Sequence, residues 1–249
     1  MIDIHAHILP DIDDGAADMK ASLEMAAMAV ESGVQVLAAT PHSAVHSSRK
    51  NLWDADLKSR ILQLRAELER ADIPLKIVPG MEIYGTEEVP ELLKQGRLVG
   101  LNLSRYTLVE FAFYNYAAQA TDILEEIIKN GMTPVVAHPE RYDYVKNDPS
   151  LLNIWVKMGC LLQVNKGSLL GNFGRSEYYL SMELIERGFA CAVASDAHSP
   201  EVRTTWMRDV KRLVSEEFSE QAAVRLLYTN PLRILKNESL QMQEPYWFR

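Results

Sequence analysis

Short apolar runs alternate with longer segments of helical character along this chain, and the alternation constrains the fold more than any other sequence feature. Apolar runs that suit buried strands end at residues 7, 40, 78, 109, 138, 164 and 194. Helices are predicted at residues 19–32, 52–71, 89–95, 118–130, 149–158, 177–187, 204–217 and 220–228. Strands that alternate with helices pair in parallel through right-handed crossovers. We therefore predict a one-domain α/β fold whose seven strands form a closed or nearly closed barrel.

The composition disfavours several broad classes of protein. No apolar stretch in the 249 residues approaches the roughly 18 residues of a membrane span, and the N-terminus does not resemble a secretion signal. The net charge of -8 would repel a phosphate backbone, which disfavours a nucleic-acid partner. Cys160 and Cys191 lie in apolar runs and allow no framework of disulfides. We therefore expect a cytoplasmic protein without a membrane span.

Ionisable side chains stand at the end of one apolar run after another. His5 and His7 are two residues apart, so on a strand they project from the same face. In a barrel of parallel strands, the strand ends and the loops that follow them meet at one mouth. The side chains expected there are those of His5, His7, Asp14, His42, Glu82, Glu110, His138, Asp196 and His198. In contrast, His46 is expected to be exposed in a polar loop, and Asp11 and Asp13 are expected to shape the first turn.

The size of this set predicts a metal centre. A single histidine at a strand end is more often a satisfied rim residue than a ligand. Burying so many carboxylates and imidazoles together, however, would be very costly unless cations neutralised the carboxylates. The set offers nitrogen and oxygen but no thiolate, which favours manganese, iron or zinc. The donors exceed what one ion needs, so we expect two or three ions with a bridging carboxylate such as Glu82, an arrangement suited to hydrolysis at phosphorus.

Two arginines follow predicted ligands closely, Arg141 after His138 and Arg203 after His198. A guanidinium group matches phosphate oxygens in bidentate fashion, so both are candidates for substrate binding, although a solvated surface arginine is an equally simple interpretation of each alone. A cysteine nucleophile is disfavoured, because neither cysteine has an arginine at the spacing that would cradle a phosphate. The tail at 244–249 is too apolar for water, so it is expected to dock on the body or to meet a partner.

In order and placement, these motifs resemble the metal-binding motifs of the PHP superfamily (polymerase and histidinol phosphatase domains). The residues that carry the resemblance are His5-Ala-His7, Asp14, His42, Glu82, Glu110, His138 and Asp196-Ala-His198. Residues 1–15, 137–142, 163–168 and 194–198 are most similar to the manganese-dependent protein tyrosine phosphatases of bacterial capsule and exopolysaccharide loci. The similarity extends to about Asn237. It implies a distorted seven-stranded barrel of the PHP type at residues 1–237 and a C-terminal tail at 238–249.

The resemblance also implies three divalent metal ions, with manganese favoured over iron or zinc. One ion would be bound by His5, His7, Glu82 and Asp196, a second by Glu82, Glu110 and His138, and a third by Asp14, His42 and His198. Arg141 and Arg203 fall where the phosphate-binding arginines of the family fall.

The reaction expected from this resemblance is hydrolysis of phosphotyrosine by in-line attack of a metal-bridging hydroxide, without a covalent enzyme intermediate. The implied partner is the phosphorylated tyrosine-rich tail of a bacterial tyrosine kinase that controls capsule or exopolysaccharide synthesis. Three alternatives stay open. They are a PHP phosphatase acting on a small molecule such as histidinol phosphate, a PHP nuclease, which the acidic balance disfavours, and a regulatory or binding module stabilised by metals.

Overall fold

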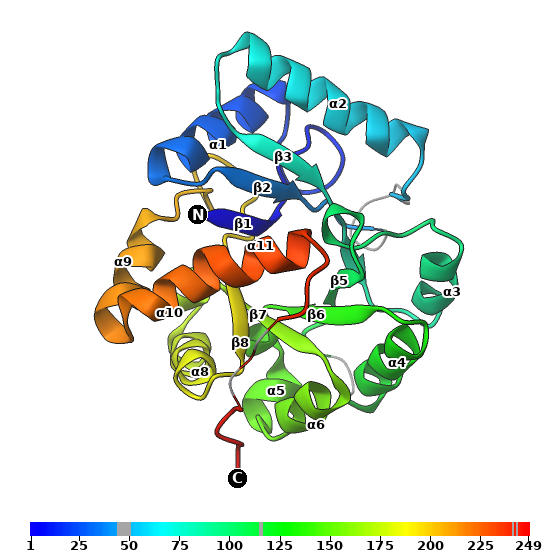
Figure 1. Cartoon of the computed structure of the whole chain (residues 1–249), viewed down its shortest axis with the longest axis vertical. Coiled ribbons are helices and arrows are strands. Elements are labelled where there is room, and N and C mark those ends of the chain that lie inside the picture. The colour runs from blue at the N-terminus through cyan, green and yellow to red at the C-terminus, as the bar shows by residue number, and fades with distance from the viewer. Residues whose placement is uncertain (44–50, 115–116, 241, 243) are drawn as a thin grey trace.

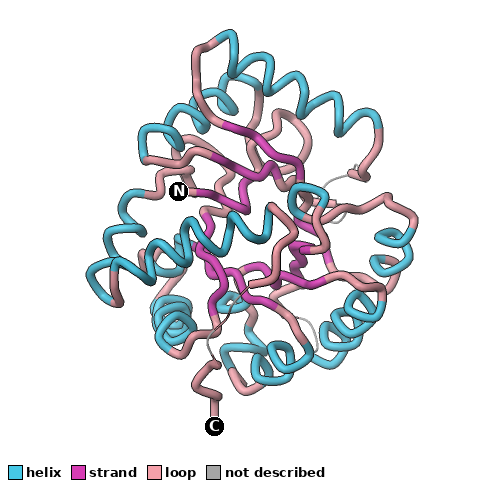
Figure 2. The backbone as a smooth tube through the Cα atoms, in the orientation of Figure 1, coloured by secondary structure: helices cyan, strands magenta, loops and turns pink. Residues whose placement is uncertain are grey.

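The strands form two parallel sheets. The computed structural model describes residues 1–43, 51–114, 117–240, 242 and 244–249 (Figure 2). One sheet has the order β1-β2-β3 and the other the order β4-β5-β6-β7-β8. The strands are β1 (Ile2–Ala6), β2 (Val36–Ala39), β3 (Lys76–Pro79), β4 (Glu82–Tyr84), β5 (Tyr106–Glu110), β6 (Thr133–Ala137), β7 (Leu161–Asn165) and β8 (Ala190–Ala194). The predicted α/β class with parallel strands is therefore confirmed. His46 lies outside the described residues.

The predicted count of seven strands in one barrel is not confirmed. The run that ends near residue 78 and the segment that reaches Glu82 are two separate strands, β3 and β4, which belong to different sheets. Pro79 has no N–H to donate to a ladder, so the pairing stops there. Isolated parallel bridges join the two sheets on both sides, between Ala6 and Ala197 and between His42 and Glu82.

Helices surround the strands (Figure 1). The α-helices are α1 (Met19–Ser32), α2 (Ala55–Arg70), α3 (Val89–Lys94), α4 (Ala117–Lys129), α5 (Asp143–Asn147), α6 (Leu151–Met158), α7 (Lys166–Leu169), α8 (Arg175–Glu186), α9 (Arg208–Glu217), α10 (Glu220–Val224) and α11 (Asn230–Leu235). Short helical turns occur at η1 (Leu101–Leu103), η2 (Pro139–Arg141) and η3 (Arg225–Thr229). Helices α1 and α2 lie beside β1–β3, whereas α11 crosses against β1 and β8 (Figure 1).

The long helices have clear start and stop signals. The side chain of Asp18 accepts a hydrogen bond from the backbone N–H of Ala21 and so caps α1, and Gly33 ends this helix in the left-handed conformation. Asp54 caps α2 in the same way. The helix predicted from residue 204 begins only at Arg208. The short helices α5, α7 and α11 were not expected, because segments of four to six residues give no measurable periodicity.

The packing of the strands explains how the site is placed. Tyr106 and Leu108 on β5, and Ala192 and Ala194 on β8, belong to one buried apolar cluster to which α11 contributes Ile234 and Leu235. Alternate residues of a strand share a face, so Glu110 continues the face of Leu108. Asp196 lies two residues beyond Ala194, the last residue of β8. The carboxylates thus stand at the ends of strands whose preceding residues are packed in the core.

The C-terminal tail docks on the body. The ring of Phe189, immediately before β8, lies 5.0 Å from that of Phe248 and 5.8 Å from that of Trp247, measured between centroids. Asn153 of α6 donates a hydrogen bond to the carbonyl of Phe248 at 2.9 Å and accepts one from its N–H at 3.1 Å. None of the helices in the described part of the chain combines the length and apolar character needed to cross a bilayer.

Candidate metal centre

Two imidazoles from β1 and its end meet in a buried cluster. The Nε2 atoms of His5 and His7 lie 3.3 Å apart, and neither side chain is exposed to solvent. The opposite nitrogen of each ring is already engaged. His5 Nδ1 lies 2.8 Å from Gln163 Oε1, and His7 Nδ1 lies 2.8 Å from Asp13 Oδ2. These contacts orient both Nε2 atoms toward the cluster, as the outer partners of metal-binding histidines commonly do.

The carboxylates of Glu82 and Asp196 stand directly opposite these imidazoles. Glu82 Oε2 lies 3.2 Å from His5 Nε2 and 3.0 Å from His7 Nε2, and its other oxygen lies 3.0 Å from His138 Nε2. Asp196 Oδ1 lies 3.4 Å from His5 Nε2. Donor atoms of His5, Glu82, His138 and Asp196 all lie within 4.8 Å of one another. This buried quartet has the donor set and spacing of a metal site.

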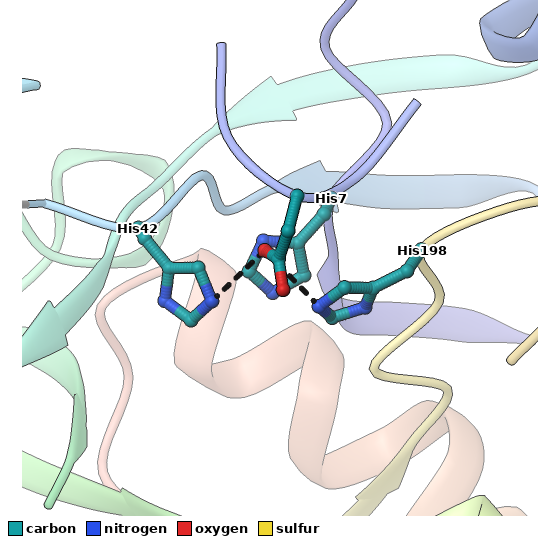
Figure 3. A group of neighbouring side chains, drawn as sticks. His7, His42 and His198 are labelled. Carbon is teal, nitrogen blue, oxygen red and sulfur yellow. Dashed lines mark ion pairs between the residues drawn. The ribbon is translucent and has the colours of Figure 1, made fainter. Parts of the chain in front are cut away.

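A second group of donors lies beside the first and nearer to solvent. It consists of His7, Asp14, His42 and His198, whose ligand atoms also lie within 4.8 Å of one another. His7, His42 and His198 come from three different strand ends and lie together around one point (Figure 3). Asp14 Oδ1 lies 3.3 Å from His42 Nε2 and 3.5 Å from His198 Nε2. Asp14 is exposed, so this group opens toward the surface.

A third group joins the other two. His42 Nδ1 lies 3.2 Å from Glu82 Oε2 and 2.8 Å from Glu110 Oε1. His42, Glu82 and Glu110 therefore form a further set of possible ligands. The structure thus brings all the predicted ligand residues together in one place. His7 Nε2 also lies 3.6 Å from Asp196 Oδ1, so His7 is placed next to the donors of both the buried quartet and the second group.

The hydrogen bonding of the cluster shows whether cations fit there. Glu82 Oε2 and Asp196 Oδ1 are buried and have no hydrogen bond of good geometry within the described part of the chain, although imidazole nitrogens surround them. Buried polar atoms that lie close together without well-aligned hydrogen bonds are costly in a protein interior. A divalent cation between these nitrogens and oxygens would satisfy them, so the residues fit a metal centre.

The electrostatics of the cluster give the same result. Burial opposes protonation of His42, but the neighbouring carboxylates, Glu82 foremost, outweigh it and raise the pKa of His42 to about 12. Burial likewise opposes protonation of His7, and Asp13 outweighs it and raises the pKa to about 9. The pKa of Asp196 is lowered in spite of burial, first by His5 and then by Arg203. The carboxylates therefore require positive charge beside them, which protons on imidazoles supply when no metal does.

Two arginines line the same cavity, whose volume is about 190 Å³. Arg141 Nη1 lies 3.2 Å from Asp196 Oδ2, and the guanidinium of Arg203 contacts the same oxygen. The Nε atom of Arg203 is buried and has no hydrogen-bonding partner among the described residues. Its backbone has a left-handed φ of 53°, a conformation that costs energy for a residue with a side chain. An incoming anion would pair with donors that the protein leaves available.

The residues that orient the proposed ligands are not predicted from the sequence. Asp13, expected only to shape a turn, also contacts His7 and accepts a hydrogen bond from the backbone N–H of His42 at 2.9 Å. Asn165 donates to Asp196 Oδ2 at 2.6 Å, and its own backbone N–H donates to the buried carboxylate of Glu140 at 2.9 Å. Asp13 is one residue from a predicted ligand, and Gln163 and Asn165 lie in the segment 163–168 that carries part of the family resemblance, but neither signal assigns a role to these side chains.

A comparison with protein families identifies the group to which the chain is related. The model described as "Capsular polysaccharide synthesis, CpsB/CapC" matches residues 1–236. The chain belongs to the CpsB/CapC family. Relatives in this family include tyrosine-protein phosphatase YwqE of Bacillus subtilis, which is 36% identical over 98% of this chain and 95% of its own length. Tyrosine-protein phosphatase CpsB of Streptococcus pneumoniae is 30% identical over 96% of this chain and 99% of its own length.

Solved structures extend the CpsB/CapC comparison to the fold. One matching chain comes from the crystal structures of YwqE from Bacillus subtilis and CpsB from Streptococcus pneumoniae, described as unique metal-dependent tyrosine phosphatases. It covers 100% of both chains with a TM-score of 0.94 and 36% identity. The phosphotriesterase homology protein of Escherichia coli matches 91% of this chain and 95% of its own with a TM-score of 0.59 and 13% identity, so this likeness concerns the fold alone.

Proposed function

We propose that this protein is a metal-dependent phosphatase that hydrolyses phosphotyrosine. The observation that carries the proposal is the convergence of the predicted imidazole and carboxylate ligands with Arg141 and Arg203 around one small cavity. Relatives that align over almost the whole chain are named tyrosine-protein phosphatases, which supports the same activity.

The centre would hold three divalent ions, with manganese favoured and iron or zinc as alternatives. His5, His7, Asp14, His42, Glu82, Glu110, His138, Asp196 and His198 are the ligands. When bound, the ions supply a water activated near neutral pH and neutralise charge on the transferred phosphoryl group. Glu82 Oε2 lies within 3.2 Å of imidazoles at the ends of β1 and β2, so its carboxylate would serve two of the ligand groups.

The side chains of the protein bind and orient the phosphate. Arg141, from the turn η2 after β6, and Arg203, from the segment after β8, both line the cavity, so their guanidinium groups are placed to bind a phosphate and stabilise the charge that develops on its oxygens. The leaving group is a phenolate with a pKa of about 10, which departs without a strong general acid. The reaction needs no covalent enzyme intermediate, and both cysteines are buried.

The substrate in the cell is the phosphorylated tyrosine-rich tail of a bacterial tyrosine kinase that controls capsule or exopolysaccharide synthesis. The family description supports a role in capsular polysaccharide synthesis. We further propose that the two sheets are parts of one distorted barrel, which the bridges Ala6–Ala197 and His42–Glu82 complete. The residues 1–237 form this domain and 238–249 its tail. Buried free cysteines support a location in the reducing cytoplasm.

The proposal is tested with protein purified without chelator and loaded with Mn²⁺. We expect two to three bound ions by elemental analysis and a higher kcat/KM on a phosphotyrosine peptide than on histidinol phosphate. His42→Ala should lose activity by about 10² to 10³-fold and keep its circular dichroism spectrum, because His42 contacts two ligand groups. A higher rate on histidinol phosphate would select the small-molecule alternative. Failure of the loaded wild-type protein to hydrolyse any aryl phosphate would favour a metal-stabilised binding module.

A further inference from the structure

Arg141 has two aromatic neighbours that the metal centre does not explain. Its guanidinium carbon lies 4.7 Å from the ring centroid of Phe113 and 4.4 Å from that of Phe173. Within the described residues, the one hydrogen-bonding contact of its side chain is with Asp196 Oδ2. Of the two rings, Phe113 lines the cavity, whereas Phe173 is not among the described residues that line it. Arg141 lies between the ring of Phe173 and the cavity, so it provides a route by which Phe173 can affect a ligand there.

The segment that carries Phe173 is built to hold its ring in place. The backbone N–H of Asn172 donates to the carbonyl of Gly167 at 2.8 Å, and that of Gly171 donates to the carbonyl of Ser168 at 3.0 Å. A Cβ atom at Gly167 would lie 2.6 Å from Cε2 of Phe173, so the ring packs directly on the start of α7. The position of the ring thus depends on a glycine that leaves room for it.

Asp196 alone is a weak anchor for Arg141. Its Oδ2 atom is shared with Arg203 and Asn165, and its Oδ1 atom lies among the imidazoles of the metal centre. An aromatic face attracts a guanidinium group without occupying its N–H donors. A ring stacked on Arg141 therefore fixes the plane of the guanidinium and leaves the donors available for phosphate oxygens.

We propose that Phe173 is a positioning residue that holds the guanidinium of Arg141 in the orientation that binds the phosphate of the substrate. The inference rests on the proposed phosphatase function and deepens it, because it names what orients one of the two phosphate-binding arginines. Phe173 acts through Arg141 and does not touch the substrate itself.

The test compares variants of the full-length protein loaded with Mn²⁺. Phe173→Leu keeps an apolar side chain but removes the aromatic face, so kcat/KM on p-nitrophenyl phosphate should fall about tenfold. The dissociation constant of inorganic phosphate, measured by calorimetry, should rise by a similar factor. Phe173→Tyr keeps the ring and should stay within twofold of the wild type. Phe218→Leu removes a partly buried phenylalanine at the end of α9 and serves as the matched control, without change in either quantity.

A double-mutant cycle separates positioning from a general effect on folding. In an Arg141→Ala background, Phe173→Leu should change phosphate affinity and kcat/KM by less than twofold, because the group on which it acts is gone. Gly167→Ala should displace the ring and reproduce the loss seen for Phe173→Leu, again only when Arg141 is present. Thermal unfolding of each variant shows whether the fold is intact.

Each outcome decides the proposal. An equal loss from Phe173→Leu with and without Arg141, or no loss in either background, overturns it. If the wild type binds phosphate but does not hydrolyse p-nitrophenyl phosphate or a phosphotyrosine peptide, the proposed phosphatase function is wrong. The effect of Phe173→Leu on phosphate affinity then still tests the role of Phe173. If the loaded wild type binds no phosphate, both proposals are overturned.

Discussion

Asp13 contacts two of the proposed ligands of the metal centre and does not itself belong to any of the three groups. Its carboxylate contacts His7 Nδ1 at 2.8 Å and accepts a hydrogen bond from the backbone N–H of His42 at 2.9 Å. Carboxylates in this outer position fix the orientation of an imidazole and increase its basicity as a ligand. We expect Asp13→Asn to weaken Mn²⁺ binding by about 10 to 100-fold, measured by calorimetry, because the amide keeps the shape but loses the charge.

Asp11→Asn is the matched control for this substitution, since Asp11 is an exposed aspartate of the same turn. Its φ of 48° is a left-handed conformation that asparagine tolerates well. Mn²⁺ affinity should stay within twofold of the wild type in this variant. A similar loss in both variants would mean that the turn as a whole, and not the contact with His7, determines affinity.

The two cysteines make a prediction about alkaline pH. Burial raises the pKa of Cys160 and of Cys191 to about 12, whereas an unfolded cysteine has a pKa of about 8.5. Between these values the unfolded chain binds fewer protons than the folded one, so the free energy of unfolding falls as the pH rises. The stability that each buried thiol contributes is complete below about pH 8.5, and about 2 kcal/mol of it is lost at pH 10.

Urea unfolding at pH 8 and pH 10 measures this effect in the wild type and in the Cys160→Ala/Cys191→Ala variant. The variant should lose less stability over this interval than the wild type, and it should keep its phosphatase activity at pH 7. An equal loss in both proteins would show that other groups carry the pH dependence. A large loss of activity would reopen a role for a cysteine in the chemistry.

At this scale, the sequence predicts which ionisable side chains converge better than it predicts the residues that support them. Histidines and carboxylates at strand ends can be recognised from their spacing, because strand geometry determines which side chains share a face. Gln163, which fixes His5, and Phe173, which contacts Arg141, come from other loops and strands. Such contacts depend on how the chain packs in three dimensions, and no local pattern encodes them.

At the scale of elements, predicted and observed boundaries agree where local signals are strong. Helix α1 covers the predicted residues 19–32, because Asp18 and Gly33 mark its ends unambiguously. The division of β3 from β4 could not be predicted, since it depends on which neighbour each short strand pairs with. Strand pairing is a long-range property, and although Pro79 and Gly80 mark a break in the chain, nothing local indicates that the strand after the break joins the other sheet.

The docked tail is an element whose contribution can be measured separately. Trp247 and Phe248 pack against Phe189 before the start of β8, whereas the metal centre lies beyond the other ends of the strands. Deleting residues 244–249 should lower the free energy of unfolding by about 1–3 kcal/mol, since the buried aromatic area outweighs the entropy of ordering a short segment. Chemical denaturation measures the loss, and kcat/KM should change by less than twofold.

Trp247→Ala/Phe248→Ala in the full-length protein provides the matched variant for the deletion. It should account for most of the lost stability, because these two rings make the aromatic contacts with Phe189 and also lie under Lys157 and Arg187. A deletion that lowers kcat/KM tenfold with little change in stability would contradict the separation of the tail from the site.

At the scale of the whole molecule, the electrostatic cost of burying ionisable groups is concentrated at the candidate metal centre. The alternation of strands and helices allows the sequence to predict that distant side chains converge, since parallel strands in such folds end at a common edge. Because burial alone would favour neutral carboxyl groups, the lowered pKa of Asp196 and Glu82 depends on positive charge held nearby. The protein without metal obtains this charge from its own protonated imidazoles and from Arg203.

Metal removal should therefore lower the stability of the whole domain. Ions that bind the folded state and not the unfolded chain stabilise it by about 2.7 kcal/mol at a concentration 100 times the dissociation constant. For a domain of this size, that corresponds to a rise in Tm of about 5–10 °C on addition of Mn²⁺ to protein treated with chelator, measured by differential scanning calorimetry.

Glu82→Gln should abolish most of the rise, because Glu82 belongs to two of the three ligand groups. Lys20, an exposed residue whose ion pair with Glu24 lies on the outer surface of α1, offers the control Lys20→Gln, which should keep the full rise. A Tm that does not respond to Mn²⁺ in the wild type would show that the crowded side chains are tolerated by protonation alone, and the metal centre would then have to be abandoned.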